Sequence, residues 1–239
     1  MITTLLLTSA AYALPMDVSA RLEEVAPLRT LRLVDDAPQI SSEDYAKALQ
    51  GKVATGLVDK PGHKARIAWG VGVVDVPIDR MWAAVNDDKS KVEYTDLEHI
   101  VLLKGELCGV HRTVFQYLGV SLLSDRWWVV DQRQNTALQS RSGGKAREVT
   151  WESVDDMQGA IVGQTEASDW AAKGIPVGST HGSWFLVDLG EGRTLVEYHA
   201  LSDPGGSVPA RMASSFAAGS ISTTIERMAQ LAESGSTCL

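Results

Sequence analysis

The chain contains a long series of short β-like runs followed by one long amphipathic helix, and this order limits the folds that it can adopt. The runs are separated mainly by turn residues, such as Lys104-Gly105 and Gly190-Glu191-Gly192. Connections this short join antiparallel strands, because a parallel pair needs a crossover of about a dozen residues or more. We therefore expect an α+β fold, in which a curved antiparallel sheet wraps around the C-terminal helix and buries its apolar face against it.

The individual elements follow from hydrophobic periodicity and from turn residues. The expected strands cover 52–58, 65–76, 92–104, 108–118, 126–138, 146–154, 183–189 and 194–201. The expected helices cover 21–26, 42–50, 78–85 and 209–231, and Ser41 or Ser42 caps the second of them. Residues 155–180 are less regular, and we expect a loop there with a helical turn near 167–172.

Composition indicates a globular protein and argues against two kinds of partner. The 239 residues are 44% hydrophobic and 22% charged, and the net charge is −8. Binding to nucleic acid depends on clustered cations, so a net-acidic chain is a poor candidate for it. The same balance argues against a polybasic attachment to anionic lipid. We therefore expect no nucleic acid partner.

The N-terminus has the pattern of an export signal. Residues 1–16 contain no charge, and the apolar run Leu5-Leu6-Leu7 precedes the small-x-small sequence Ala11-Tyr12-Ala13. This predicts a signal peptide at 1–13, cleavage after Ala13 and export to the periplasm. The alternative is a cytoplasmic protein in which this segment is structural. A helical segment is expected at 14–50, the sheet-and-helix domain at 51–233 and a tail at 234–239.

The two cysteines leave two possibilities open. Cys108 and Cys238 are too few for a disulfide scaffold and lack the CxxC spacing of zinc or thiol-redox sites. In an oxidising compartment they can form a bridge. Otherwise both are free thiols.

Motifs for cofactor or metal chemistry are absent. Gly70-Val71-Gly72 lies within an expected strand and lacks the third glycine of a dinucleotide loop. Gly178-Ser179-Thr180-His181-Gly182 has threonine where a nucleophile elbow needs serine. The five histidines do not have the spacing of a metal-binding helix or strand. We expect no cofactor, no metal and no catalytic residue.

Three segments together resemble a known superfamily. Residues 76–85 are similar to its entry from a strand through a proline into an amphipathic helix, and residues 117–130 resemble its bend before an arginine- and tryptophan-containing strand. Gly182-x-Trp184, Thr194-x-Val196-x-Tyr198 and Asp203-Pro204-Gly205-Gly206-x-x-Pro209 resemble its final hairpin and the turn into its last helix. This is the START-related lipid-transfer superfamily with the helix-grip fold, often called SRPBCC, which includes pollen-allergen-like proteins and polyketide cyclases. The resemblance makes 51–233 a START-like domain.

The resemblance implies a hydrophobic cavity between the sheet and the last helix. Side chains alternate along strands, so Arg126, Trp128 and Gln132 share one face, and Thr113, Phe115 and Tyr117 share one face of the preceding strand. The expected ligand-binding residues are Arg126, Trp128, Gln132, Thr113, Phe115, Tyr117, Trp184, Met212 and Phe216. Alternatively, the aromatic residues are plain core and Arg126 is solvated.

The leading hypothesis for function is non-catalytic binding or transfer of a lipid or another hydrophobic small molecule, with transient contact to a membrane. The alternative is an enzyme similar to polyketide cyclases and aromatases, with His111, Tyr117 or Arg126 as acid–base groups. A third possibility is a scaffold or sensor whose own side chains fill the cavity.

Overall fold

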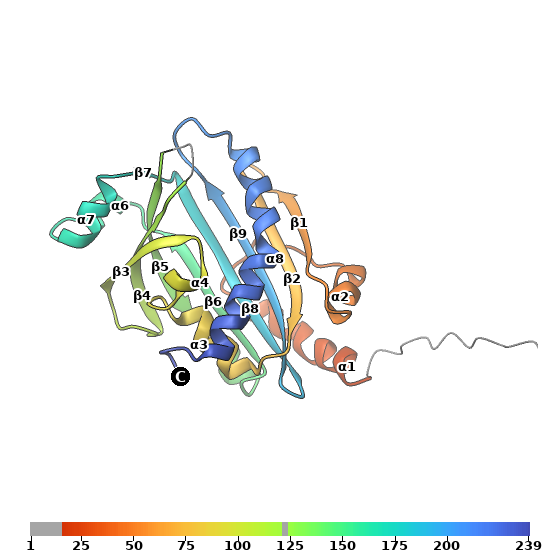
Figure 1. Ribbon diagram of the computed structural model, residues 1–239. Helices are drawn as coiled ribbons and strands as arrows, with labels where there is room; N and C mark the ends of the chain where they lie inside the picture. The colour runs from red at the N-terminus through yellow and green to blue at the C-terminus, as the bar shows by residue number, and fades with distance from the viewer. Residues whose placement is uncertain (1–15, 121–123) are drawn as a thin grey trace, which may run out of the picture.

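The computed structural model describes residues 16–120 and 124–239, which form an open, curved sheet with helices against both faces (Figure 1). The predicted signal peptide at 1–13 lies outside the described residues. The strands are β1 (Ala54–Asp59), β2 (Arg66–Val74), β3 (Leu97–Lys104), β4 (His111–Leu118), β5 (Arg126–Gln134), β6 (Ala146–Ser153), β7 (Ile175–Pro176), β8 (Ser179–Gly190) and β9 (Arg193–Asp203). The helices are α1 (Met16–Val25), the 3-10 helix η1 (Ala26–Leu31), α2 (Ser42–Leu49), α3 (Ile78–Asn86), α4 (Lys91–Tyr94), α5 (Thr136–Arg141), α6 (Met157–Ala160), α7 (Thr165–Ala171) and α8 (Ala210–Ser234).

The sheet is antiparallel along its whole main path, which runs β1-β2-β9-β8-β6-β5-β4-β3. The short strand β7 pairs in parallel with β5, off this path. Strands β1 and β3 form the two ends, so the described sheet does not close into a barrel. The predicted α+β helix-grip architecture is confirmed.

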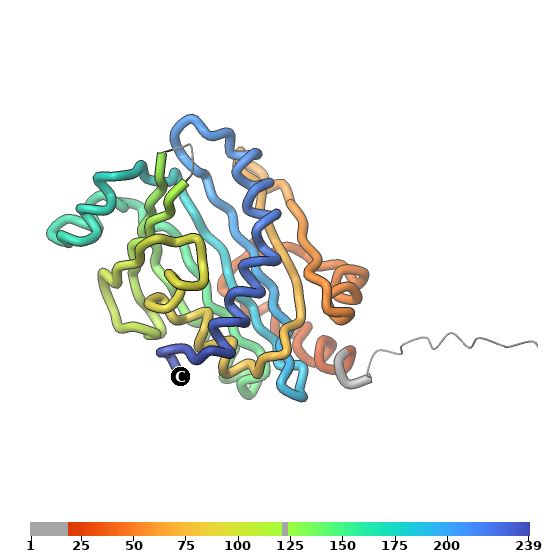
Figure 2. Tube along the Cα trace, viewed as in Figure 1, coloured from red at the N-terminus to blue at the C-terminus, as the bar shows by residue number. Residues whose placement is uncertain are grey.

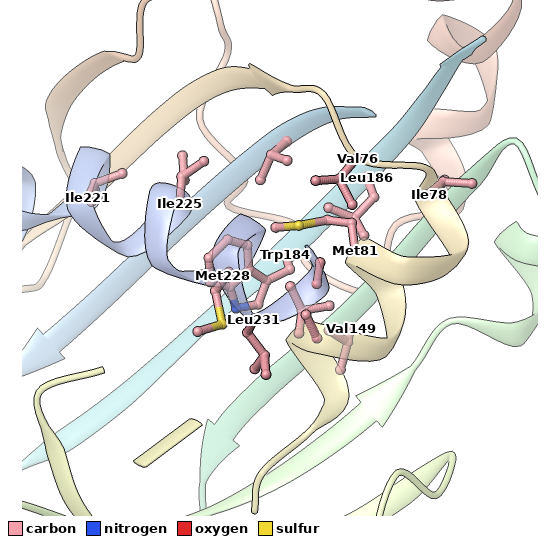
Figure 3. Packing of buried hydrophobic residues seen from close by; sticks show 14 of the residues in the cluster. Val76, Ile78, Met81, Val149, Trp184, Leu186, Ile221, Ile225, Met228 and Leu231 are labelled. Carbon is pink, nitrogen blue, oxygen red and sulfur yellow. The ribbon is translucent and has the colours of Figure 1, made fainter. Parts of the chain in front are cut away.

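Helix α8 lies across one face of the sheet and packs on β1, β2 and β9, as the tube in Figure 2 makes clear. Its buried positions Ile221, Ile225, Met228 and Ala232 recur every three or four residues, which is the spacing of one helical face. With Met81 of α3 they belong to the largest core cluster, which also takes in Trp184 and Leu186 of β8 (Figure 3).

The opposite face of the sheet is covered by the N-terminal helices. Phe185 and Leu195 point to this side and pack against a cluster that includes Val25 and Ala48. No helix among residues 16–120 and 124–239 is long and apolar enough to cross a membrane.

Buried ion pairs also hold the N-terminal segment to the sheet. Arg29 forms an ion pair with Glu197, and the Nε of Arg32 lies 2.8 Å from Glu148. Burial alone would raise the pKa of Glu197, but hydrogen bonding and charge from Arg29 hold it below its usual value. Glu197 is therefore ionised in the folded protein, and both carboxylates bind the segment that precedes the sheet.

Two predicted strands are shorter than expected because a short helix occupies one end of each predicted segment. Segment 92–104 begins with the single turn α4, where the Thr95 hydroxyl donates to the Lys91 carbonyl. Segment 126–138 leaves the sheet after Gln134, because the Asn135 side chain accepts from the amide of Leu138 and caps α5. The irregular stretch 155–180 contains α6, α7 and β7.

Candidate ligand-binding cavity

A cavity of about 280 Å³ lies between the sheet and α8. Strands β4, β5, β6, β8 and β9 form one wall, and residues from α3 to β3 and from α8 form the other. The lining residues are Val85, Lys91, Thr95, Asp96, Leu97, Gln116, Leu118, Trp128, Val130, Gln132, Val149, Trp151, Thr180, Trp184, Tyr198, Ala200, Ser202, Thr224 and Met228. Most of them are apolar or aromatic, as in small-molecule sites generally.

Aromatic rings dominate the sheet side of the cavity. Tyr198 stacks on Trp151 with ring centroids 5.6 Å apart, and it meets Trp184 in a tilted arrangement at 4.4 Å. The indole N–H of Trp128 donates to the side-chain carbonyl of Gln116 at 2.6 Å. Burial raises the pKa of Tyr198 to about 12, so its phenol is neutral at physiological pH. The wall is thus apolar, with single polar atoms at its rings.

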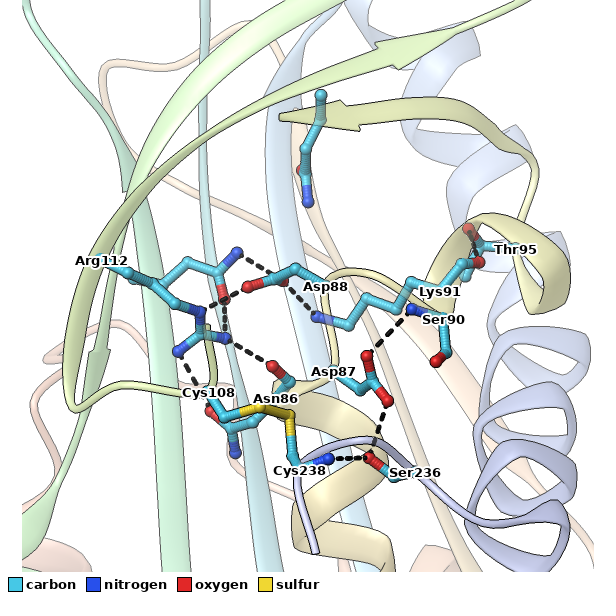
Figure 4. Close-up of polar contacts among 12 residues, drawn as sticks. Asn86, Asp87, Asp88, Ser90, Lys91, Thr95, Cys108, Arg112, Ser236 and Cys238 are labelled. Carbon is cyan, nitrogen blue, oxygen red and sulfur yellow. Dashed lines mark hydrogen bonds and ion pairs between the residues drawn. A yellow bond between two sulfur atoms is a disulfide. The ribbon is translucent and has the colours of Figure 1, made fainter. Parts of the chain in front are cut away.

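A polar cluster adjoins the cavity beside Gln132. The carboxylate of Asp88 accepts hydrogen bonds from Arg112, from Lys91 at 3.0 Å and from Gln132 at 3.1 Å (Figure 4). Burial alone would raise the pKa of Asp88, but the charges of Lys91 and Arg112 lower it below its usual value. Asp88 is therefore ionised, as a buried acid with two cationic partners should be.

Three of the predicted site residues line this cavity. Trp128 and Gln132 do so from β5, on the face that strand alternation predicts, and Trp184 does so from β8. Whether they bind a ligand stays a prediction.

Three others point to the opposite face of β4. Gln116 pairs with Trp128 across the β4–β5 ladder, so the even-numbered residues of β4 face the cavity. Thr113, Phe115 and Tyr117 do not line it, contrary to expectation. Phe115 and Tyr117 instead pack in the cluster under α6 and α7, and Thr113 donates to Asp131 at 2.6 Å.

Arg126 is buried, yet it faces neither the cavity nor solvent. Its Nε donates to the Pro204 carbonyl at 2.6 Å, and one terminal nitrogen donates to the Ser124 carbonyl. One of these carbonyls lies just before β5, and the other lies in the turn after β9. The guanidinium therefore connects these two segments. Arg126 was expected to line the cavity. In the structure it instead binds the backbone of the protein.

Met212 and Phe216 also lie away from the cavity. They are 45% and 72% exposed on the outer side of α8. The buried side of this part of the helix is marked by Ser214, whose hydroxyl accepts from the Arg66 amide at 2.9 Å. The expectation that Met212 and Phe216 line the cavity is therefore wrong, because this part of α8 turns a serine to its buried side.

Trp151, Tyr198 and Lys91 line the cavity without having been predicted to do so. Strand alternation could have placed the first two, because residues two positions apart lie on the same face of a strand. Trp151 follows the apolar Val149 by two residues, and Tyr198 follows the apolar Val196 by two. The sequence gives no comparable signal for Lys91, which lies on the one-turn helix α4.

A disulfide joins Cys108 to Cys238, with their Cα atoms 5.6 Å apart, so the first of the two possibilities for the cysteines holds in this structure. The bridge ties the tail after α8 to the β3–β4 connection. Asp87 binds the same tail through the hydroxyl of Ser236 at 2.9 Å (Figure 4) and through the amide of Thr237 at 2.6 Å. Within the described residues, no group of three or more His, Cys, Asp or Glu side chains is placed to hold a metal ion.

No family model and no curated protein matches the chain. Several solved structures match the chain. A fragment of the STAR-related lipid transfer protein of Xanthomonas axonopodis is 17% identical, with a TM-score of 0.60 over 82% of this chain and 97% of that chain. Human StAR-related lipid transfer protein 5 is 11% identical, with a TM-score of 0.60 over 92% and 97% of the two chains. Human STARD10 is 10% identical, with a TM-score of 0.58 over 84% and 83%.

The chain therefore has the START-like helix-grip fold. The resemblance that the three sequence segments indicated is confirmed at the level of the fold.

Proposed function

We propose that the protein is a non-catalytic carrier that binds a lipid-like or other hydrophobic small molecule in the cavity between the sheet and α8. The observation that supports this most is the cavity wall formed by Trp128, Trp151, Trp184 and Tyr198. Solved proteins of the same fold include lipid transfer proteins. A wall of this kind desolvates a ligand over a large apolar area, which provides most of the affinity in such sites.

The volume of the cavity limits the size of the ligand. Ligand sites occupy roughly 300–1,000 Å³, and this cavity of about 280 Å³ lies just below that range. A molecule with a single acyl chain or a compact ring system fits this space better than a phospholipid with two chains.

The enzymatic alternative has little support from the cavity. His111 has an exposed side chain, Tyr117 donates to Asp125 on the other face of the sheet, and Arg126 binds backbone carbonyls. None of the three groups lines the cavity, where an acid–base group would have to act on a bound substrate.

Two further proposals concern where the carrier works. Export to an oxidising compartment such as the periplasm is supported by the Cys108–Cys238 bridge, because such bridges are rare in reducing compartments. Transient membrane contact is supported by Met212 and Phe216, two large apolar side chains exposed one turn apart on α8. Intact mass of the protein from its native host tests export, and retention of residues 1–13 would contradict it.

Native mass spectrometry after gentle purification, followed by lipid extraction, tests the carrier function directly. A co-purifying hydrophobic molecule is expected. A protein that carries none, and that also fails to bind the neutral dye Nile red, would support the scaffold or sensor alternative.

A matched pair of variants locates the binding site. Thr224 lines the cavity, whereas the neighbouring Thr223 is exposed on the same helix. Thr224→Phe is expected to fill the cavity and reduce Nile red binding at least 10-fold, and Thr223→Phe is expected to leave it unchanged. Equal binding by both variants would place the dye elsewhere.

A further inference from the structure

Lys91 is a buried cation on the cavity wall. It lies on α4, its side chain is 11% exposed, and among the described residues it is the one cation that lines the cavity. An ammonium has three N–H donors. In the described part of the chain its one side-chain partner is Asp88, at 3.0 Å (Figure 4). Two donors are therefore left for a partner outside the chain.

Asp88 is shared among three donors, which occupy three of the about four acceptor sites on its two oxygens. One oxygen accepts from Lys91 and from the Gln132 amide, and the other accepts from Arg112. The carboxylate thus divides one negative charge between two cations.

All the N–H donors of Arg112 bind acceptors within the protein. Beside its bond to Asp88, it donates to the side-chain and backbone oxygens of Asn86, to the Gly109 carbonyl at 3.0 Å and to Gln132 at 2.6 Å. Its side chain is fully buried. A guanidinium has five N–H donors, and these contacts use all of them. Arg112 consequently holds Asp88 and Gln132 in place and leaves Lys91 to face the cavity.

The other acidic side chains near Lys91, those of Asp87 and Asp96, bind other partners. Asp87 accepts from the amides of Ser90 and Thr237 and from the hydroxyl of Ser236. Asp96 also borders the cavity, but its side chain is largely exposed and pairs with Arg227 at 2.6 Å. Neither of them contacts the Lys91 ammonium.

We propose that Lys91 binds the carboxylate head group of the ligand, so that the carrier selects hydrophobic acids over neutral molecules of the same size. This inference rests on the proposed carrier function. The two remaining N–H donors of the Lys91 ammonium can bind a carboxylate, and the aromatic wall of Trp128, Trp151 and Trp184 receives the apolar part of the ligand. Burial lowers the pKa of Lys91 despite the opposing charge of Asp88, and a bound anion offsets that cost of burial.

Two probes with the same chain test the inference on the unaltered protein. Dodecanoic acid and dodecan-1-ol differ in the head group alone, and their dissociation constants are measured by isothermal titration calorimetry at pH 7. We expect the acid to bind about 10- to 100-fold more tightly, which is the effect of one hydrogen bond to a charged group. Equal affinities would overturn the inference and leave the carrier function standing. If neither probe binds and no hydrophobic molecule co-purifies, the carrier function itself fails.

Lys91→Gln and Lys89→Met locate the head-group site. The glutamine amide can still donate to Asp88 but has no charge, so the preference for the acid over the alcohol should disappear. Lys89 is exposed two residues away, and its substitution removes the same charge without touching the cavity. The Lys89→Met variant should keep the preference. Retention of the preference in folded Lys91→Gln would overturn the assignment to Lys91.

Discussion

Arg126 at the start of β5 donates from its Nε to the backbone carbonyl of Pro204 at 2.6 Å, and it thereby ties two segments 78 residues apart. The turn that contains Pro204 connects β9 to α8, the helix that forms one wall of the cavity. The buried arginine thus finds its partners in the backbone of the fold.

Replacement of Arg126 is therefore expected to affect stability and to leave ligand binding unchanged. Arg126→Met leaves the carbonyls of Pro204 and Ser124 without a charged donor, which should lower the free energy of unfolding by about 1.5–3 kcal/mol. Arg211→Met is the control, because Arg211 is exposed and its pair with Asp59 should contribute less than about 1 kcal/mol. Urea unfolding measures both. An Arg126→Met variant as stable as the parent would show that these bonds contribute nothing.

Acidification below pH 6.5 should destabilise the protein through His199. Burial, with the nearby charge of Arg32, lowers the pKa of His199 to about 3, whereas an unfolded histidine titrates near 6.5. Between these values the unfolded chain binds a proton that the folded protein excludes, so stability falls as the pH falls. The slope approaches about 1.4 kcal/mol per pH unit for one such group.

Urea unfolding at pH 6.5, 5.5 and 4.5 measures this slope. His199→Gln should flatten it, and His63→Gln, at an exposed position, should not. The pKa of Asp36 is lowered by its hydrogen bond to His181, so its contribution is lost only below about pH 4, outside this window. An unchanged slope in His199→Gln would contradict the prediction.

Reduction of the Cys108–Cys238 disulfide should lower the free energy of unfolding by about 2–4 kcal/mol. The bridge spans 130 residues of sequence and restricts the unfolded chain over most of its length. Unfolding is compared with and without dithiothreitol, with thiol titration as the proof of reduction. The double variant Cys108→Ser/Cys238→Ser should show the same loss and no response to the reductant. If full reduction leaves the unfolding curve in place, the bridge does not stabilise the fold.

Strand alternation predicted the β5 side of the cavity and failed on β4 for a physical reason. Both faces of β4 are covered, by the cavity on one side and by α6 and α7 on the other. Phe115 and Gln116 therefore offer no contrast between a dry and a wet face, and the correct face cannot be read from hydropathy alone. On β5, Trp128 and Gln132 were placed correctly.

The polar cluster lay beyond prediction because it is assembled from distant parts of the chain. Asp88 follows α3, Arg112 is on β4 and Gln132 is on β5, and each looks unremarkable in its own segment. The orientation of α8 was misjudged at Met212 and Phe216 because a serine takes the buried position between them. In contrast, the turn before α8 was expected at 203–209 from its resemblance to the superfamily, and Gly205 and Gly206 in it both have positive φ, at 64° and 62°.

Substitution of Gly205 should destabilise the protein by about 1–2 kcal/mol or more. A side chain with φ near 64° strains the backbone by roughly that amount. A Cβ at this position would also lie 2.7 Å from the Pro176 carbonyl oxygen. We therefore expect Gly205→Val to unfold at lower urea concentration than the parent. Gly219→Ala is the contrasting control: it lies within α8 with no heavy atom within 4 Å of a Cβ, so it should stabilise the helix by about 0.5–1 kcal/mol. A Gly205→Val protein with the unfolding midpoint of the parent would show that the turn tolerates another conformation.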